Sequence, residues 1–251
     1  MKTLFLALFA AFACLSAKAP AAERGAAPLR PMPEALEIRF ALSAAPPALR
    51  GDATVYVLDP ASGYRRVREG HDGIACLVER TPWEMRELRN DVYIPLCYDA
   101  AGDRSYLQAK RDTAALRAQG LDASALAAEM EKRWADGSYR VPAGAGVSYM
   151  VAPVMRAVGP PDLQVHTMTM PHLMFYAPGV TDADIGAKPD LADKASLAWP
   201  FIARQGNDAQ SYIIQMVGTA EKAAIVAGQR DLLRELCAYD KVLCLPSAGH
   251  Y

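Results

Sequence analysis

Histidine and methionine alternate along one short segment of the chain. Residues 166–174 read HTMTMPHLM and place five such side chains at every second position: His166, Met168, Met170, His172 and Met174. In an extended strand, alternate side chains share one face and lie about 6.6 Å apart. Thioether and imidazole groups together suit Cu(I), so two or three neighbours in this row could bind a copper ion.

The same row has an ordinary structural explanation. Methionine is a flexible filler of apolar cores, and a histidine can be buried when it has a hydrogen-bond partner. Pro171 cannot donate to a strand ladder, so we expect it to break the strand and put the two halves out of phase. We therefore favour a core strand and keep a copper-binding protein as an alternative.

A second group of residues could support acid–base or nucleophilic chemistry. Asp182 and Asp184 stand two residues apart in APGVTDADIG and could hold a hard cation or act as an acid/base pair. With His172 and Ser148 they would form a hydrolase-like cluster if the fold brought them together. His71, in EGHDGI, is the remaining candidate.

Local structure explains these residues as well. The two aspartates follow Thr181 and are typical of residues that cap a short helix, and His71 fits a solvated turn between two strands. The chain contains no G-x-S-x-G, P-loop or H-E-x-x-H motif. GAGVSY at 144–149 is better explained as a turn before a strand than as a phosphate loop. No cofactor follows from these patterns.

The cysteines predict two disulfides. Cys14 belongs to the expected signal peptide, which leaves Cys76, Cys97, Cys237 and Cys244. An even number of cysteines in an oxidising compartment is typical of disulfides, although four cysteines permit three connectivities. We favour Cys76–Cys97 and Cys237–Cys244, because each pair is close in the chain and flanked by turn residues. A zinc site is the alternative, but no C-x-x-C spacing supports it.

Residues 1–22 have the layout of a secretory signal peptide. An apolar run at 4–15, too short to span a bilayer, precedes small residues at 17–19. The alternative is a buried N-terminal helix. Lipid anchoring through Cys14 is not expected, because the two residues before it make a poor lipobox. We predict cleavage between residues 19 and 22 and a periplasmic or extracellular location.

The remaining composition limits the partners. Without Lys2 and Lys18, the 27 basic residues become 25 against 28 acidic ones, a formal charge of −3. This mixed, near-neutral balance does not favour a nucleic-acid partner. No other segment reaches the roughly 18 apolar residues of a membrane-spanning helix, so we expect no transmembrane anchor in the mature chain.

The pattern of elements predicts an α+β fold. We expect a flexible Ala/Pro-rich leader at 23–35 and a single domain at 36–251. Residues 54–80 suggest a three-stranded β-meander, and the insertion after it suggests a surface loop tethered by Cys76–Cys97. Helices are expected at 104–119, after Asp122 or Ser124 with a stripe of Leu126, Met130 and Trp134, and at 220–239.

Short strands return at 146–217, including a hairpin in PFIARQGNDAQSYIIQMV. Strands, then helices, then strands, without a βαβ rhythm, favour mainly antiparallel short strands with several helices packed on one face.

Several segments resemble blocks in a group of exported bacterial proteins with no assigned activity. They are ALSAAPP (41–47), ATVYVL (53–58), CLVER (76–80) and PHLMFYAP (171–178). The resemblance implies an exported single unit and carries no activity, cofactor or site residue. We therefore expect a non-catalytic binding or envelope-associated protein, with a hydrolase-like enzyme and a periplasmic copper binder as the alternatives.

Overall fold

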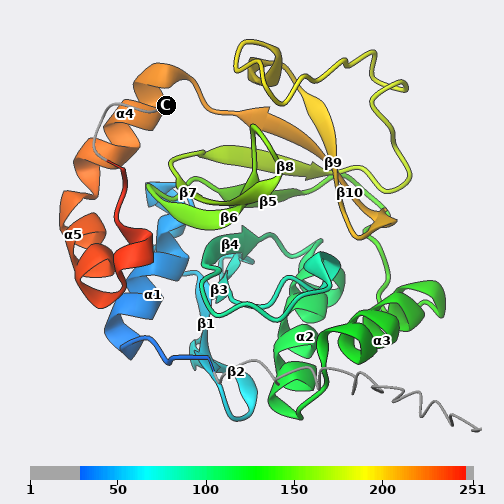
Figure 1. Cartoon of the computed structure of the whole chain (residues 1–251), viewed down its shortest axis with the longest axis horizontal. Helices are drawn as coiled ribbons and strands as arrows, with labels where there is room; N and C mark the ends of the chain where they lie inside the picture. Colours follow the sequence, from blue (N-terminus) through cyan, green and yellow to red (C-terminus); the bar gives the residue numbers. More distant parts are fainter. Residues whose placement is uncertain (1–28, 247–251) are drawn as a thin grey trace, which may run out of the picture.

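The computed structural model describes residues 29–246, so the expected signal peptide lies outside the described residues. An eight-stranded sheet forms its centre (Figure 1). Its strands are β1 (Thr54–Asp59), β2 (Gly63–Arg68), β3 (Ala75–Glu79), β4 (Ile94–Tyr98), β5 (Val147–Met150), β8 (His172–Tyr176), β9 (Phe201–Gln205) and β10 (Asn207–Met216). They lie in the order β2-β1-β3-β4-β5-β8-β10-β9. A two-stranded sheet is formed by β6 (Met155–Gly159) and β7 (Gln164–Met168).

The strand pairing is antiparallel except between β1 and β3, which are parallel. The predicted meander is therefore wrong, because β3 lies on the far side of β1 from β2. The chain returns past the start of β1, where Gly70 approaches the backbone so closely that a Cβ would lie 1.8 Å from the carbonyl oxygen of Asp52. Strand β2, with three exposed or half-buried arginines, suits the edge of a sheet, whereas the buried β1 suits its interior.

Helices cover both faces of the sheet, and residues 29–246 contain five α-helices. They are α1 (Glu34–Ser43), α2 (Gln108–Ala118), α3 (Ala123–Ala135), α4 (Thr219–Gly228) and α5 (Arg230–Tyr239). In Figure 1, α1 and α5 lie together on one side, and α2 and α3 lie on the other. Cys76 and Val78 join the core with Phe40 of α1, whereas Leu77 joins the core with Leu116 of α2.

The α+β class is confirmed, but the expectation that the helices pack on one face is wrong. Successive side chains of a strand point to opposite faces, and all five residues of β3 and all five of β4 are buried. Strands that are apolar at consecutive positions need cover on both sides.

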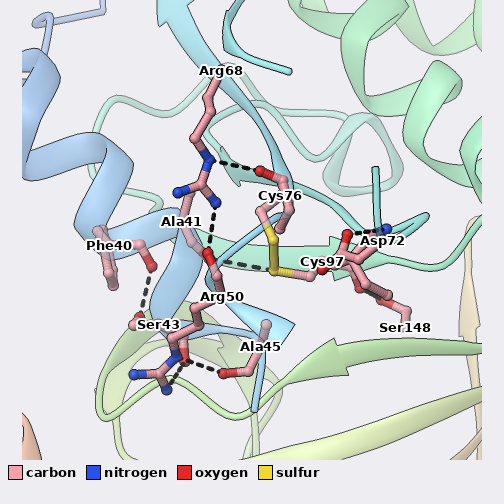
Figure 2. The surroundings of a disulfide bond; sticks show 12 residues. Phe40, Ala41, Ser43, Ala45, Arg50, Arg68, Asp72, Cys76, Cys97 and Ser148 are labelled. Atoms are coloured by element: carbon pink, nitrogen blue, oxygen red, sulfur yellow. Dashed lines mark hydrogen bonds between the residues drawn. A yellow bond between two sulfur atoms is a disulfide. The ribbon is translucent and has the colours of Figure 1, made fainter. Parts of the chain in front are cut away.

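Both predicted disulfides are present, Cys76–Cys97 and Cys237–Cys244. Cys76 and Cys97 face each other across β3 and β4 beneath the end of α1, and Sγ of Cys97 lies 3.5 Å from the carbonyl oxygen of Ala41 (Figure 2). The segment between these cysteines is not simply a surface loop, because Trp83 is buried within it. The Trp83 ring packs so closely against Gly206 that a Cβ there would lie 2.4 Å from it.

Other local predictions have mixed outcomes. Asp122 caps α3 by accepting a hydrogen bond from the amide of Ala125, and the stripe of Leu126, Met130 and Trp134 is buried, as predicted. The hairpin of β9 and β10 is also confirmed. The segment expected to be one helix at 220–239 is divided into α4 and α5 at Gln229, which has non-helical backbone angles.

The predicted flexible leader does not extend to residue 35. Leu29 packs with Leu58 and Ala114, Met32 is buried beside α1, and α1 itself begins at Glu34. Apolar side chains at 29 and 32 thus hold this segment against the domain. Within residues 29–246, no helix is long and apolar enough to cross a membrane.

Candidate functional site

The histidine and methionine row is divided between two sheets. His166 and Met168 belong to β7 in the small sheet, whereas His172 and Met174 belong to β8 in the large one. Met170 lies between the strands, next to Pro171. The strand break expected at Pro171 is confirmed, and the five side chains do not form one continuous face.

Each histidine of this row has its own local partner. Nε2 of His166 lies 2.7 Å from Oδ1 of Asp162, and Nδ1 of His172 donates to the carbonyl oxygen of Met170 at 2.7 Å. Burial lowers the pKa of His172 to about 4, so its imidazole is neutral at physiological pH. Met168 and Met174 are buried in the main core. In the part of the chain that the structure describes, no three His, Cys, Asp or Glu side chains are grouped to hold a metal ion.

Ser148 and His172 lie on adjacent strands but make separate hydrogen bonds. The buried hydroxyl of Ser148 donates to the carbonyl oxygen of Cys97 at 3.1 Å (Figure 2). In the ladder, Ser148 faces Met174 and His172 faces Met150, so the serine and histidine are not opposite each other. The geometry thus gives Ser148 a structural partner instead of a general base.

The other acid–base candidates also have structural partners. Asp184 accepts hydrogen bonds from the amide and hydroxyl of Thr181, at 2.8 and 2.7 Å. Asp182 accepts the amide of Ile202 at 2.7 Å and so occupies a backbone donor of the edge strand β9. His71 is exposed, with Nδ1 3.4 Å from a carboxylate oxygen of Asp52.

A pocket of about 390 Å³ lies at the end of the central sheet where β4 stops and β5 begins. One wall comes from the connection between β4 and α2, and the other comes from the connection between α3 and β5. Its lining consists of Ala100, Ala101, Arg104, Ser138, Arg140, Pro142, Ala143 and Gly144, and we refer to it as the loop pocket.

One carboxylate joins the two walls of the loop pocket. Oδ1 of Asp99 accepts the amide of Gly102 at 3.0 Å, and Oδ2 accepts the amide of Val147 at 2.7 Å. The hydroxyl of Tyr176 donates to Oδ1 at 3.0 Å. Gly102 and Gly146 both need to be glycine here, because a Cβ on either would lie less than 3.0 Å from Tyr176. The walls are therefore held at a set separation.

Buried tyrosines anchor the two arginines of the loop pocket. Tyr106, two residues after Arg104, stacks on Tyr176 at 4.7 Å between ring centroids and donates to the carbonyl oxygen of Ala209 at 3.0 Å. Tyr139, next to Arg140, donates to a carboxylate oxygen of Asp112 at 2.9 Å. The backbone is held in place on both sides, while both arginine side chains are exposed.

A buried ion pair lies elsewhere, between the end of β3 and α2. Nζ of Lys110 is 2.8 Å from Oε1 of Glu79 and 3.8 Å from Glu84, and the Lys110 side chain is fully buried. Burial alone would lower the pKa of Lys110, but the two carboxylates outweigh it and keep that pKa above its ordinary value. The ion pair links α2 to β3 of the sheet, and the ammonium group of Lys110 stays charged.

Sequence reasoning did not identify the residues of the loop pocket. Arg104 and Arg140 are 36 positions apart and carry no motif, and Asp99 and Tyr176 are equally inconspicuous. The nearest signal is GAGVSY at 144–149, interpreted as a turn before a strand. That interpretation is confirmed, since β5 begins at Val147, yet Gly144 also lines the pocket.

Comparisons of the chain with protein families, with curated proteins and with solved structures find no match. The resemblance of PHLMFYAP and the related segments to exported bacterial proteins accordingly stays a prediction.

Proposed function

We propose that this chain is an exported, non-catalytic binding protein whose ligand occupies the loop pocket. The observation that carries the proposal is the attachment of both walls to Asp99, through Gly102 on one side and Val147 on the other. A pocket held in shape by the fold binds small molecules with little loss of conformational entropy. Its volume of about 390 Å³ is in the range of small-molecule sites.

Export to the periplasm or the cell exterior is part of this proposal. Two disulfides support it, because such bonds persist in oxidising compartments. The layout of residues 1–22 supports it further. Mass spectrometry of the chain exported by its native host is expected to show a new N-terminus between residues 20 and 23. An uncleaved chain in the cytoplasm would contradict this part of the proposal.

The hydrolase-like and copper-binding alternatives have less support. The hydroxyl of Ser148 is directed to Cys97, and the imidazole of His172 is directed to Met170. The side chains of the copper alternative are divided between β7 and β8, which lie in different sheets, and both histidines already have a local partner. We therefore place the ligand at the loop pocket.

Thermal unfolding with a panel of small molecules tests the proposal. The panel contains amino acids, neutral sugars, carboxylates and phosphorylated compounds, and we expect at least one class to raise the melting temperature. A ligand at a hundredfold excess over its Kd stabilises the folded state by about 2.7 kcal/mol.

A pocket-filling variant supplies the control. Ala143 lines the pocket, so Ala143→Trp is expected to abolish the shift. Ala223 is exposed on α4 and does not line the pocket, so Ala223→Trp is expected to preserve the shift. A panel without any stabilising compound, or a shift that survives Ala143→Trp, would contradict a ligand in this pocket.

A further inference from the structure

We infer that the ligand of the loop pocket presents a doubly charged oxyanion, either a phosphate monoester or a dicarboxylate, to Arg104 and Arg140. The inference rests on the proposed function, because it names the ligand class of the same pocket. Of the eight lining residues, only these two arginines are charged, and both are positive. The lining includes no carboxylate.

The guanidinium groups of Arg104 and Arg140 form no hydrogen bond or ion pair with residues 29–246, unlike most arginines that the structure describes. Arg133, for example, pairs with Asp112 at 2.9 Å and with Glu129 at 2.8 Å. Among residues 29–246, the arginine side chains that form neither a hydrogen bond nor an ion pair are Arg104, Arg140 and Arg230. Two of these three arginines, Arg104 and Arg140, line the loop pocket.

Two carboxylates near the loop pocket, Asp136 and Asp99, accept hydrogen bonds from their own loops. Asp136 accepts the amide of Ser138 at 3.0 Å and also its hydroxyl. Asp99 has its oxygens occupied by Gly102, Val147 and Tyr176. These two acids shape the walls and form no ion pair with Arg104 or Arg140, so both guanidinium groups are available to a ligand.

Guanidinium chemistry selects the class of ligand. Arginine presents a planar set of donors that matches carboxylate and phosphate oxygens, and such hydrogen bonds are stronger than neutral ones. Two exposed cations in one pocket favour a ligand with charge −2, because each cation can then meet one negative charge. A neutral sugar would leave both charges unpaired.

Calorimetric titration at low ionic strength tests the inference with two probes, inorganic phosphate and succinate. Binding of at least one is expected, with a dissociation constant that increases as salt is added. Phosphate alone would identify a phosphate site, and succinate alone a dicarboxylate site.

Matched arginine variants locate the binding. Arg104→Ala and Arg140→Ala are each expected to weaken binding about tenfold or more, since each removes charged hydrogen bonds. Arg230→Ala removes an equally unpaired arginine outside the pocket and is expected to have no effect. Arg140→Lys retains the charge but loses the planar donor set, so an intermediate affinity is expected.

The outcomes distinguish this inference from the proposed function. If neither phosphate nor succinate binds while a neutral compound stabilises the protein and loses its effect in Ala143→Trp, the anion class is wrong and the binding site stands. If the anions bind equally well to Arg104→Ala, Arg140→Ala and the unmodified chain, the assignment to these arginines is overturned. If no compound binds at all, both fail together.

Discussion

The hydroxyl of Tyr176 on β8 donates to Oδ1 of Asp99 at 3.0 Å, and this contact connects a central strand to both walls of the loop pocket. The same carboxylate accepts the amides of Gly102 and Val147. Two connections far apart in the chain are thus held by one side chain. The shape of the pocket depends on a residue that does not line it.

Removal of the Tyr176 hydroxyl is expected to destabilise the fold. A hydrogen bond to a charged group contributes about 1.5–3 kcal/mol, so Tyr176→Phe should lower the free energy of unfolding by about this amount. Asp99→Ala should lower the free energy of unfolding further, because it also leaves the amides of Gly102 and Val147 without their acceptor. Urea unfolding measures both. Tyr149→Phe is the control, since no hydrogen bond of the Tyr149 hydroxyl is seen within residues 29–246. An unchanged urea midpoint for Tyr176→Phe would contradict a stabilising role of the hydrogen bond between Tyr176 and Asp99.

Replacement of Lys110 is expected to lower the free energy of unfolding more than most single substitutions. Lys110→Met leaves the buried carboxylate of Glu79 without its cation, and breaking a buried pair from one side costs about 3–5 kcal/mol. Replacing both members, as in Lys110→Met with Glu79→Leu, should restore part of the loss.

Lys132 provides the comparison, because it pairs with Glu129 at 3.5 Å on the surface. Lys132→Met should change the stability by less than about 1 kcal/mol. Equal effects of Lys110→Met and Lys132→Met in urea unfolding would show that the buried pair contributes no more than a surface one.

His172 is expected to make the folded state sensitive to mild acid. Burial lowers its pKa from 6.5 to about 4, so the unfolded chain takes up this proton at higher pH than the folded chain. The associated stability is present in full above pH 6.5 and is lost as the pH falls toward 4, by up to about 3 kcal/mol. His172→Asn should remove this loss, measured by urea unfolding at pH 7, 6 and 5.

Glu37 is expected to make the folded state less stable as the pH rises, which is the opposite of the effect of His172 over an overlapping pH range. This residue of α1 is buried, and burial raises its pKa from 4.5 to about 7, although its Oε1 accepts the amide of Leu58. Its contribution is present in full below pH 4.5 and is lost as the pH rises toward 7. Compared with the unmodified chain, the change in stability from pH 5 to 7 should therefore be more negative in His172→Asn and more positive in Glu37→Gln, and identical pH profiles for the two variants would refute both assignments.

The disulfides are expected to leave no free thiol in the protein once the proposed signal peptide, with Cys14, is removed. Thiol titration of denatured, unreduced protein should give a value near zero, and two or more reactive thiols would contradict the pairing. Replacing Cys76 and Cys97 together by alanine opens a loop with a sequence separation of 21 residues. The loop-closure model assigns about 3 kcal/mol to such a bond, which urea unfolding can measure.

Local signals were sufficient for several features of this protein. The cap at Asp122 and the apolar stripe after it predict α3, because both depend on residues within a few helical turns. The break at Pro171 follows from its missing amide hydrogen. The pairing of Cys76 with Cys97 and of Cys237 with Cys244 follows from closeness in the chain.

The strand order, the cover on both faces of the sheet and the loop pocket were decided by tertiary structure. EGHDGI has the composition of a hairpin turn, yet the buried β1 needs a neighbour on each side, so the chain passes β1 and pairs β3 parallel to it. Arg104 and Arg140 line one pocket because Asp99 and Tyr176 hold two distant connections together. Turn and helix propensities act over a few residues, whereas these contacts join residues 48 and 77 positions apart, and only packing of the complete chain selects them.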